Sequence, residues 1–561
     1  MHSSYQPKLL AVFKEGYTKE MLAKDIVAGI IVGIIALPMA IAFAIASGAR
    51  PEEGLITAVV AGILAGALSG SRYQISGPTG AFVILVFETI QKFGYQGLLI
   101  ATLIAGIILI LMGLFRFGKA MMFVPYPVII GFTAGIALFI FTSQLHDLLG
   151  LSTENPPPPG CLAKWGLYAC SLQQVNLWSL LIGCLSILCM ALTPKFIKNL
   201  PGPLVAITLA TLIAYFFSLP VDTIGTRFGE IHAALPTFSF PEFSFMDLPR
   251  YIKPAIGIAL LAGIESLLSA SVADGMTGRR HRSNAELISQ GVANIGSALA
   301  GGLPATGAIA RTAANIRSGA ASPLAAVFHS ISLLLMLYFI SDLVALIPMP
   351  ALAGILIVVA YNMSEWRLFA KLLRSPKEDI AILLTTFALT IFVDLIVAIE
   401  AGIILAAMIF LTRMASSSTT FDIKAAFNEE EKQEDIMALR QLHIPKGTEI
   451  YEILGPLFFA AAEKFKTALS RISTRPKVLI LRMRSVPHVD ASGMRVLEDI
   501  YEKTKKEGTV LVLSGIKKDV RRSLDHAGLL KLLGEDNVQP DINHALQRAA
   551  AICQDQKNLQ F

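Results

Sequence analysis

The sequence predicts a polytopic α-helical membrane protein of fourteen spans, built as two inverted repeats of seven with two half-helices and followed by a cytoplasmic α/β domain. Composition supports this fold class, because the 561 residues have a mean hydropathy of +0.62 and only 16% are charged. Soluble chains carry about 25% charged residues. Apolar runs long enough to cross a bilayer recur as far as Arg413. Polar residues dominate beyond that point, which indicates a separate soluble region.

The formal net charge of +6 does not indicate a nucleic-acid partner. Membrane proteins concentrate Lys and Arg in cytoplasmic loops, and this biases the total. The first apolar run starts near Ile26 and is too long for the core of a cleavable signal peptide, so we expect none. These features favour a multi-pass protein of the bacterial inner membrane, with the lipid bilayer as its solvent.

Twelve long apolar runs and two short segments are the predicted spans. The long runs are residues 25–48, 54–69, 96–117, 128–148, 177–193, 203–219, 255–273, 287–300, 323–339, 343–361, 380–392 and 397–411. The short segments are residues 77–90 and 305–316, and each starts at or just after a Gly and a Pro. We therefore expect a transmembrane domain over 1–414, with one repeat over about 15–220 and the other over about 250–414.

Basic residues near the span ends predict the orientation. Clusters precede the first span, follow the fourth, sixth and eighth spans, and lie between the twelfth and thirteenth. With fourteen spans all of these clusters fall on one side, so this side and both termini are predicted to be cytoplasmic. The cluster after the eighth span, residues 279–282, has a second interpretation, which is contact with anionic lipid.

The two short segments share a sequence pattern. The first reads GPTGA at 77–81 and the second PATGA at 304–308. They are the third and tenth predicted spans, so each is third in a seven-span half, and an odd number of spans makes the two halves antiparallel. Matched interruptions of this kind indicate inverted repeats whose broken helices meet near the membrane midplane.

A half-helix that starts within the membrane leaves its first N–H groups unpaired and carries partial positive charge there. Two such N-termini facing each other form an anion site without any formal charge. Gly and Ala let a ligand approach the backbone, and Thr adds a hydroxyl donor. The alternative is that Gly and Pro interrupt transmembrane helices without a function.

Ionisable residues inside spans are candidate functional groups. Glu265 lies in the middle of the eighth span, where desolvation disfavours its ionised form, so it could carry a proton. Its alternative role is a neutral carboxyl that bonds to the helix backbone. Arg311 follows the start of the tenth span and could attract an anion or pair with Glu265. Phe43, after the helix-bending Pro38, could line a site or serve packing alone.

The polar stretch 415–438 is predicted to be a linker, and residues 439–555 an α/β domain with helices packed on a sheet. Strands are expected at 449–459, 476–482 and 509–513, and helices at 460–472, 494–506 and 517–533. Between a strand and the following helix, Asp490 and Ser492 lie where a helix cap forms. Ser492 is either part of a plain cap or a site of phosphorylation, which a helix N-terminus tolerates electrostatically.

No motif predicts an enzyme, a metal site or a cofactor. The sequence contains no phosphate-binding loop for ATP, and no nucleophile–base or metal-ligand spacing stands out. Cys161 and Cys170 share one polar segment and could pair if it faces the periplasm, although their spacing alone does not establish this.

Several stretches together resemble the SulP family of anion transporters, the sulfate-permease group. They are LPMAIAFA at 37–44, ISGPTG at 75–80, GIESLL at 263–268 and GGLP at 301–304. DASG at 490–493 resembles the loop of the STAS domain that carries a phosphorylatable serine in anti-sigma-factor antagonists. The resemblance implies fourteen spans in two inverted repeats, a C-terminal STAS domain, a homodimer, and motion of a core domain against a gate domain.

The resemblance also implies roles for individual residues. Substrate would lie between the half-helices, contacted by Phe43, Thr79, Gly80, Ala81, Gly307, Ala308, Ile309 and Arg311. Glu265 and Ser269 match the coupling-ion positions of the eighth span, and Ser492 matches the regulatory serine. Met39 departs from relatives that have Gln at this position, so a polar contact from the first span is not expected.

Glu265 resembles the residue of proton-coupled dicarboxylate carriers, whereas sodium-coupled bicarbonate carriers have Asp there. The first functional hypothesis is therefore proton-coupled symport of small carboxylates such as C4-dicarboxylates. The alternatives are a sulfate or bicarbonate carrier that is sodium-coupled or uncoupled, and a membrane-anchored STAS signalling protein.

Overall fold

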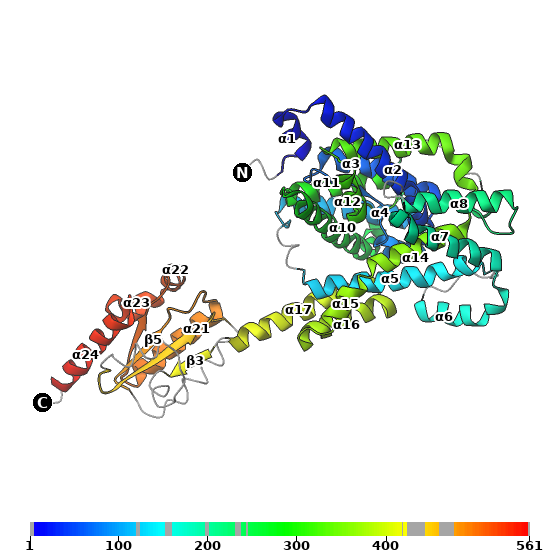
Figure 1. Cartoon of the computed structure of the whole chain (residues 1–561). Helices are drawn as coiled ribbons and strands as arrows, with labels where there is room; N and C mark the ends of the chain where they lie inside the picture. The colour runs from blue at the N-terminus through cyan, green and yellow to red at the C-terminus, as the bar shows by residue number, and fades with distance from the viewer. Residues whose placement is uncertain are drawn as a thin grey trace. The chain divides into compact units, whose positions relative to one another are not determined.

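The structure is a computed structural model that divides into two compact units, Met1–Ile404 and Leu405–Phe561 (Figure 1). It describes residues 5–118, 124–151, 160–196, 201–229, 237–242, 245–417, 419–422, 444–458 and 476–558. The units are described separately. The boundary between them falls within α17 (Leu395–Ser417), close to the end of the predicted transmembrane domain.

The first unit is helical apart from two short strands, within the described residues. Its first helices are α1 (Lys8–Glu15), α2 (Lys19–Ala46), α3 (Pro51–Leu68), α4 (Phe82–Leu114), α5 (Tyr126–Leu149), α6 (Cys161–Cys170), α7 (Leu177–Phe196), α8 (Gly202–Phe216) and α9 (Ile224–Phe228). They are followed by α10 (Leu248–Thr277), α11 (Ser283–Leu299), α12 (Ile309–Arg317), α13 (Leu324–Ala345), α14 (Met349–Met363), α15 (Trp366–Leu372), α16 (Lys377–Phe392) and α17.

Each of the fourteen predicted spans contains a helix of this unit. By length and apolar composition, eight helical segments of the described chain could cross a membrane: Lys19–Ala46, Pro51–Leu68, Phe82–Leu114, Tyr126–Leu149, Leu248–Thr277, Leu324–Ala345, Met349–Leu372 and Leu395–Met414. Leu177–Thr193 and Gly202–Phe216 are shorter apolar helices. Gly94 has non-helical φ/ψ angles and splits α4, so α4 contains both the third and the fourth predicted span.

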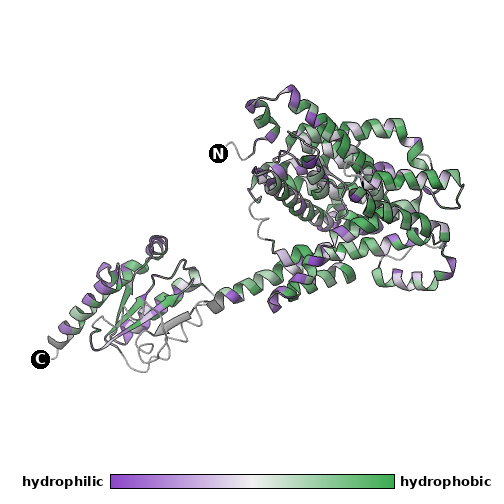
Figure 2. Ribbon diagram, in the orientation of Figure 1, coloured by the Kyte–Doolittle hydropathy of each residue, from purple (hydrophilic) through white to green (hydrophobic). Residues whose placement is uncertain are grey.

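Apolar side chains face outward on these helices, as expected for a bilayer environment. On α7, Leu177, Leu181 and Leu188 are 70%, 59% and 53% exposed. Figure 2 shows the same hydrophobic colouring along most helices of this unit. Exposed apolar faces of this extent would be unfavourable in water, so lipid is the solvent that suits them.

The helices pack as two groups. The core group consists of α2, α3, α4, α10, α11, α12 and α13, in which α4 packs on α10 and α11, and α13 on α2 and α3. The gate group consists of α5, α7, α8, α14 and α16, in which α14 packs on α5 and α7. Each group takes helices from both halves of the sequence, as intertwined repeats require.

The two interrupted segments meet in the core group. Strand β1 (Ser76–Gly77) pairs antiparallel with β2 (Thr306–Gly307), and Ser76 lies opposite Gly307. Four residues separate β1 from the start of α4, and one residue separates β2 from the start of α12. A two-stranded sheet therefore places the N-termini of both half-helices side by side.

Cys161 and Cys170 do not pair, because both are free thiols at opposite ends of α6. Nine residues of α-helix span about 13.5 Å, far beyond the Cα separation of less than about 7 Å that a disulfide allows. Cys161 is buried and Cys170 is exposed. The segment for which the sequence allowed a disulfide therefore forms a short helix without one.

The second unit contains a five-stranded sheet in the order β3 (Thr419–Asp422), β4 (Thr448–Leu454), β5 (Val478–Arg482), β6 (Val510–Ser514), β7 (Val538–Gln539). β3 is antiparallel to β4, and the remaining pairs are parallel. Along β5, Val478 and Ile480 pack with α24 (Ile542–Asn558). Leu479 and Leu481 belong to the other cluster, with α21 (Ala491–Lys506), α22 (Lys518–His526) and α23 (Leu529–Leu533). The sheet is thus covered on both faces, as predicted for an α/β domain.

Two details of this unit differ from the prediction, and two further predicted segments are not tested. β3 lies within the predicted linker and pairs with β4. The strand was not predicted, because its partner lies about thirty residues further along the chain. The predicted helix 517–533 is two helices, because Gly528 adopts a left-handed conformation between them. The predicted helix 460–472 and most of the predicted linker lie outside the described residues.

Candidate anion site

Helix α10 holds the second half-helix in place through side-chain hydrogen bonds. The backbone N–H of Gly307 donates to the Ser266 hydroxyl at 3.0 Å, and the Thr306 hydroxyl donates to the carbonyl of Ala262 at 3.0 Å. The N–H of Ala308 donates to the carbonyl of Ile75 at 2.8 Å. These bonds hold β2 and Ala308 in place, and the first-turn N–H groups of α12, as at the start of any α-helix, have no intrahelical acceptors.

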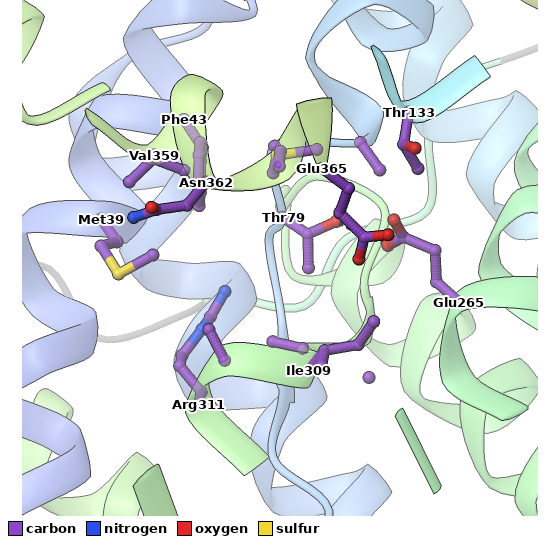
Figure 3. Close-up of a pocket in the computed structure, with 16 residues that line it drawn as sticks. Met39, Phe43, Thr79, Thr133, Glu265, Ile309, Arg311, Val359, Asn362 and Glu365 are labelled. Carbon is purple, nitrogen blue, oxygen red and sulfur yellow. Dashed lines mark hydrogen bonds between the residues drawn. The ribbon is translucent and has the colours of Figure 1, made fainter. Parts of the chain in front are cut away.

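A cavity of about 300 Å³ opens at the two half-helix N-termini. The core group contributes Met39, Phe43, Thr79, Gly80, Ala81, Glu265 and residues 307–311 to its lining. Thr133 of α5, Val359, Asn362 and Met363 of α14, and Glu365 complete the lining. In the view of Figure 3, Glu265 and Thr133 lie across the pocket from Met39 and Phe43. The cavity therefore lies between the core group and helices of the gate group.

Glu265 points into this cavity from the middle of α10 (Figure 3). Its Oε2 accepts a hydrogen bond from the Thr79 hydroxyl at 3.1 Å. The carboxyl group is therefore held beside the first half-helix, and it faces the cavity rather than the lipid. A carboxyl in this position can exchange a proton with a cavity that water reaches.

Arg311 lies in the first turn of α12, and its side chain is 1% exposed. Its Nη2 donates to the carbonyl of Pro78, while Nε and Nη1 have no hydrogen-bond partner within the described part of the chain. The structure gives it no ion pair with Glu265. A buried guanidinium with unsatisfied donors is costly, because buried cations need charge compensation and hydrogen bonds. An anion in the cavity would provide both.

The cavity brings together all eight residues predicted to contact substrate, together with Glu265. Ser269 is not part of the lining. Its hydroxyl donates to the Thr312 hydroxyl at 3.0 Å, and Thr312 in turn accepts from the Ile75 N–H at 3.1 Å. Ser269 thus contacts the half-helix α12 through Thr312 and does not itself contact the cavity.

Sequence reasoning missed the contribution of the gate group. Asn362 and Glu365 are polar residues of the lining that follow the twelfth predicted span, where they resembled ordinary residues of a polar loop. Glu365 has φ +42° and ψ 38°, an uncommon conformation for a residue with a side chain. In the sequence, the only signal was a pair of polar residues directly after an apolar span, a pattern that most membrane loops share.

Asp490 and Ser492 lie at the N-terminus of α21 in the second unit. The Asp490 side chain accepts a hydrogen bond from the Gly493 N–H at 2.8 Å and caps the helix. Ser492 is half-buried in the first turn of that helix. The cap is therefore present, and the geometry suits a negative charge at this helix N-terminus.

Comparisons with known proteins agree on the type of protein. Residues 22–386 match the family described as the sulfate permease family, and residues 440–545 match the STAS domain. The putative sulfate transporter YvdB of Bacillus subtilis is 40% identical over 525 residues, which cover 93% of this chain and 97% of the relative. The bicarbonate transporter BicA of a Picosynechococcus species is 30% identical over 535 residues, 94% of each chain.

Solved structures show the same fold. The transmembrane domain of a cyanobacterial BicA, 32% identical, has a TM-score of 0.62 over 68% of this chain and 98% of its own. The murine anion transporter Slc26a9 in its inward-facing state, 18% identical, has a TM-score of 0.86 over 98% of this chain and 94% of its own. The chain is therefore a multi-pass membrane protein and not an enzyme. It belongs to the sulfate permease family of anion transporters and carries a C-terminal STAS domain.

Proposed function

We propose that this protein is a secondary active transporter that moves a small anion together with a proton across the bacterial inner membrane. The substrate lies in the cavity between the N-termini of α4 and α12. Phe43, Thr79, Gly80, Ala81, Gly307, Ala308, Ile309 and Arg311 contact it, and Glu265 carries the proton. Ser269 has a positioning role behind α12.

The unsatisfied guanidinium of Arg311 is the observation that carries the proposal. It lies at the start of a half-helix whose first residues also line the cavity, so the guanidinium and the helix N-terminus both contribute positive potential there. An anion bound there would accept hydrogen bonds from Arg311 and from the backbone. Among the described residues of the lining, Arg311 alone supplies a formal positive charge.

The position of Glu265 supports coupling to a proton. A dianion that meets only one cation leaves an uncompensated negative charge in a low-dielectric region, and an ionised Glu265 would add another. Protonation of Glu265 removes its own part of that repulsion, and Glu365 is a second carboxyl of the lining. The loaded core group can then move against the gate group at a lower electrostatic cost than with both charges present.

The lining supports carboxylates as the first substrate class. Met39, Phe43, Ile309, Val359 and Met363 give the cavity apolar walls, which suit the methylene groups of a C4-dicarboxylate better than the oxygens of sulfate. Sulfate and bicarbonate form the second class, because the relatives YvdB and BicA are named as sulfate and bicarbonate transporters.

The deciding experiment is uptake by purified full-length protein in proteoliposomes. We expect an inward proton gradient without sodium to drive accumulation of labelled succinate, and sulfate and bicarbonate are tested in parallel under an identical gradient. Accumulation that requires sodium and ignores the proton gradient would instead support sodium coupling. Failure to move or bind any of the anions would favour a membrane-anchored signalling protein.

The two ends of the chain are proposed to be cytoplasmic, and the protein is proposed to form homodimers. The basic clusters at the span ends support this orientation. Labelling of single introduced cysteines from either side of intact cells tests the orientation.

In the STAS domain, Ser492 at the start of α21 is proposed as a regulatory site, because a phosphate would lie at a helix N-terminus.

A further inference from the structure

A second cavity, of about 280 Å³, lies beside the N-terminal helix α1. Its lining consists of three segments that are far apart in the sequence: α1, the residues that follow α3, and the C-terminal end of α10. The charged residues of the lining are Lys8, Glu15, Arg72, Asp274, Arg279 and Arg280. The anion site described above shares none of these residues.

Hydrogen bonds fix the walls of this cavity. The N–H of Lys8 donates to the carbonyl of Ser69 at 2.8 Å, which ties the first turn of α1 to the end of α3. Arg72 donates from Nη1 to Glu15 at 2.7 Å and from Nε to the carbonyl of Ala321 at 2.9 Å. The cavity is thus bounded by residues with defined positions.

The charges around the cavity do not balance. Four basic residues, Lys8, Arg72, Arg279 and Arg280, face two acidic ones. Both acidic residues are already engaged, Glu15 by Arg72 at 2.7 Å and Arg279 at 4.0 Å, and Asp274 by His281 at 2.7 Å.

Lys8 and Arg280 have no ion pair within the described ranges, although both line the cavity. Burial, followed by the positive charge of nearby Arg282, lowers the pKa of the Lys8 ammonium. The Arg282 guanidinium is itself bound to the carbonyl of Gln6 at 2.8 Å. A bound anion would relieve the repulsion among these cations.

Helix α1 also has an exposed apolar face, on the side turned away from the residues that line the cavity. Val12 packs inward at 1% exposure, whereas Leu10 and Phe13 are 51% and 52% exposed. Leu10 and Phe13 are three residues apart and so share one side of the helix. A helix with exposed apolar side chains on one side and basic groups on another is typical of a segment at the surface of a membrane with anionic lipids.

We propose that this second cavity binds a phosphate group, and that its occupant is the headgroup of an anionic phospholipid. Lys8 and Arg280 provide the free positive charges for the phosphate oxygens, and Arg72 and Arg279 provide additional positive potential. The proposal thus gives the basic run 279–282 a ligand, in addition to its effect on the orientation of the protein in the membrane.

A soluble phosphate could bind to the same basic residues. Alternatively, these residues bind no ligand and only stabilise the C-terminal end of α10, where the helix dipole is negative. Both alternatives are distinguishable from lipid binding. Lys14 provides a matched control, because it lies on α1 and is exposed but does not line the cavity. Neutralising Lys8 or Lys14 changes the total charge of the protein equally.

The test uses purified full-length protein in detergent and native mass spectrometry. Dioctanoyl phosphatidylglycerol is titrated against wild type and the variants Lys8→Gln, Arg280→Gln and Lys14→Gln, with dioctanoyl phosphatidylcholine as the zwitterionic comparison. We expect Lys8→Gln and Arg280→Gln each to weaken phosphatidylglycerol binding about five-fold, since one basic residue near an anionic lipid surface contributes about 1 kcal/mol. Lys14→Gln should leave the dissociation constant unchanged.

Inorganic phosphate identifies the source of the ligand. If millimolar phosphate does not displace the lipid, the occupant is the phospholipid as proposed. If phosphate displaces it and shows the same dependence on Lys8 and Arg280, the phosphate-binding chemistry is correct and the lipid source is wrong. The proposal as a whole is overturned if neither probe depends on Lys8 or Arg280, or if Lys14→Gln has an equal effect.

Discussion

The hydroxyl of Thr79 donates a hydrogen bond to Oε2 of Glu265 at 3.1 Å. Thr79 precedes the first half-helix, and Glu265 lies in the middle of α10, so this bond joins the proposed anion site to the proposed proton carrier. A hydroxyl can donate to a carboxylate and can accept from a carboxylic acid. The contact can therefore persist in both protonation states of Glu265 while its direction reverses.

Replacement of Thr79 by Val should impair coupling more than folding. The substitution keeps the shape of the side chain but removes the partner of Glu265, and one such bond to a charged group contributes about 1.5–3 kcal/mol. We expect proton-driven uptake in proteoliposomes to fall by about ten-fold or more. Thr79→Ser retains the hydroxyl and should remain close to wild type. Equal activity of the Val and Ser variants would show that the bond has no role in transport.

Bulky side chains at the half-helix N-termini should abolish uptake. A Cβ added at Gly80 would lie 2.8 Å from Met363 Sδ and 3.2 Å from Phe43 Cε1, so Gly80→Leu must extend into the cavity. Ala308→Trp would fill the same space from the side of α12. Gly275→Leu on α10 is the control, because no atom lies within 4 Å of its added Cβ. Wild-type uptake by both cavity variants would place the substrate elsewhere.

Removal of the Arg311 guanidinium should weaken anion binding. Because charge-assisted hydrogen bonds contribute about 1.5–3 kcal/mol, we expect Arg311→Ala to raise the dissociation constant of the substrate roughly ten-fold to a hundred-fold. Arg311→Lys should give an intermediate value, because Lys keeps the charge but lacks the planar group of donors. Ligand-dependent thermal shifts measure both.

Arg317→Ala provides the control for this series. Arg317 lies on α12 as well, is exposed and does not line the cavity. If Arg317→Ala weakens binding as much as Arg311→Ala does, the effect reflects the stability of α12 rather than contact with the anion.

The STAS domain should be dispensable for substrate binding. All described lining residues of the anion cavity belong to the unit Met1–Ile404. A chain that ends at Ser416 stops before β3, so it removes the whole five-stranded sheet and leaves no unpaired strand. We expect thermal shifts with substrate to match those of the full chain. Loss of binding in a monodisperse, folded truncation would show that the STAS domain contributes to the site.

The half-helices were predictable because their signal is local and occurs twice. The GPTGA and PATGA segments each break a helix by their own chemistry, and their matched places in the two halves predicted that they would meet. The structure places them side by side through the pairing of Ser76 with Gly307.

Other features depend on tertiary packing and leave little local trace. Asn362 at the end of α14, and Glu365 just before α15, reach the cavity only because α14 of the gate group passes beside the core group. The pairing of β3 with β4 joins residues about thirty positions apart, and nothing in the short segment TTFD predicts its partner. The role of Ser269 was also not predictable, because its hydroxyl turns toward Thr312 and away from the cavity.

Glu265 provides the most direct test of proton coupling. It is a carboxyl on the cavity wall with one side-chain hydrogen bond, from Thr79. Glu265→Gln has nearly the same shape and imitates the protonated form, but it cannot release a proton. We therefore expect this variant to bind the anion and to exchange it across the membrane, and to lose accumulation driven by an inward proton gradient.

The measurement is concentrative uptake of the best substrate in proteoliposomes, with counterflow exchange as the readout that does not require a gradient. Glu265→Asp is the control, because it retains a titratable group one methylene shorter and should keep part of the gradient-driven uptake. A structural role alone would reduce exchange and accumulation together. If Glu265→Gln still concentrates substrate as wild type does, proton coupling does not pass through this residue and the carrier model for Glu265 is wrong.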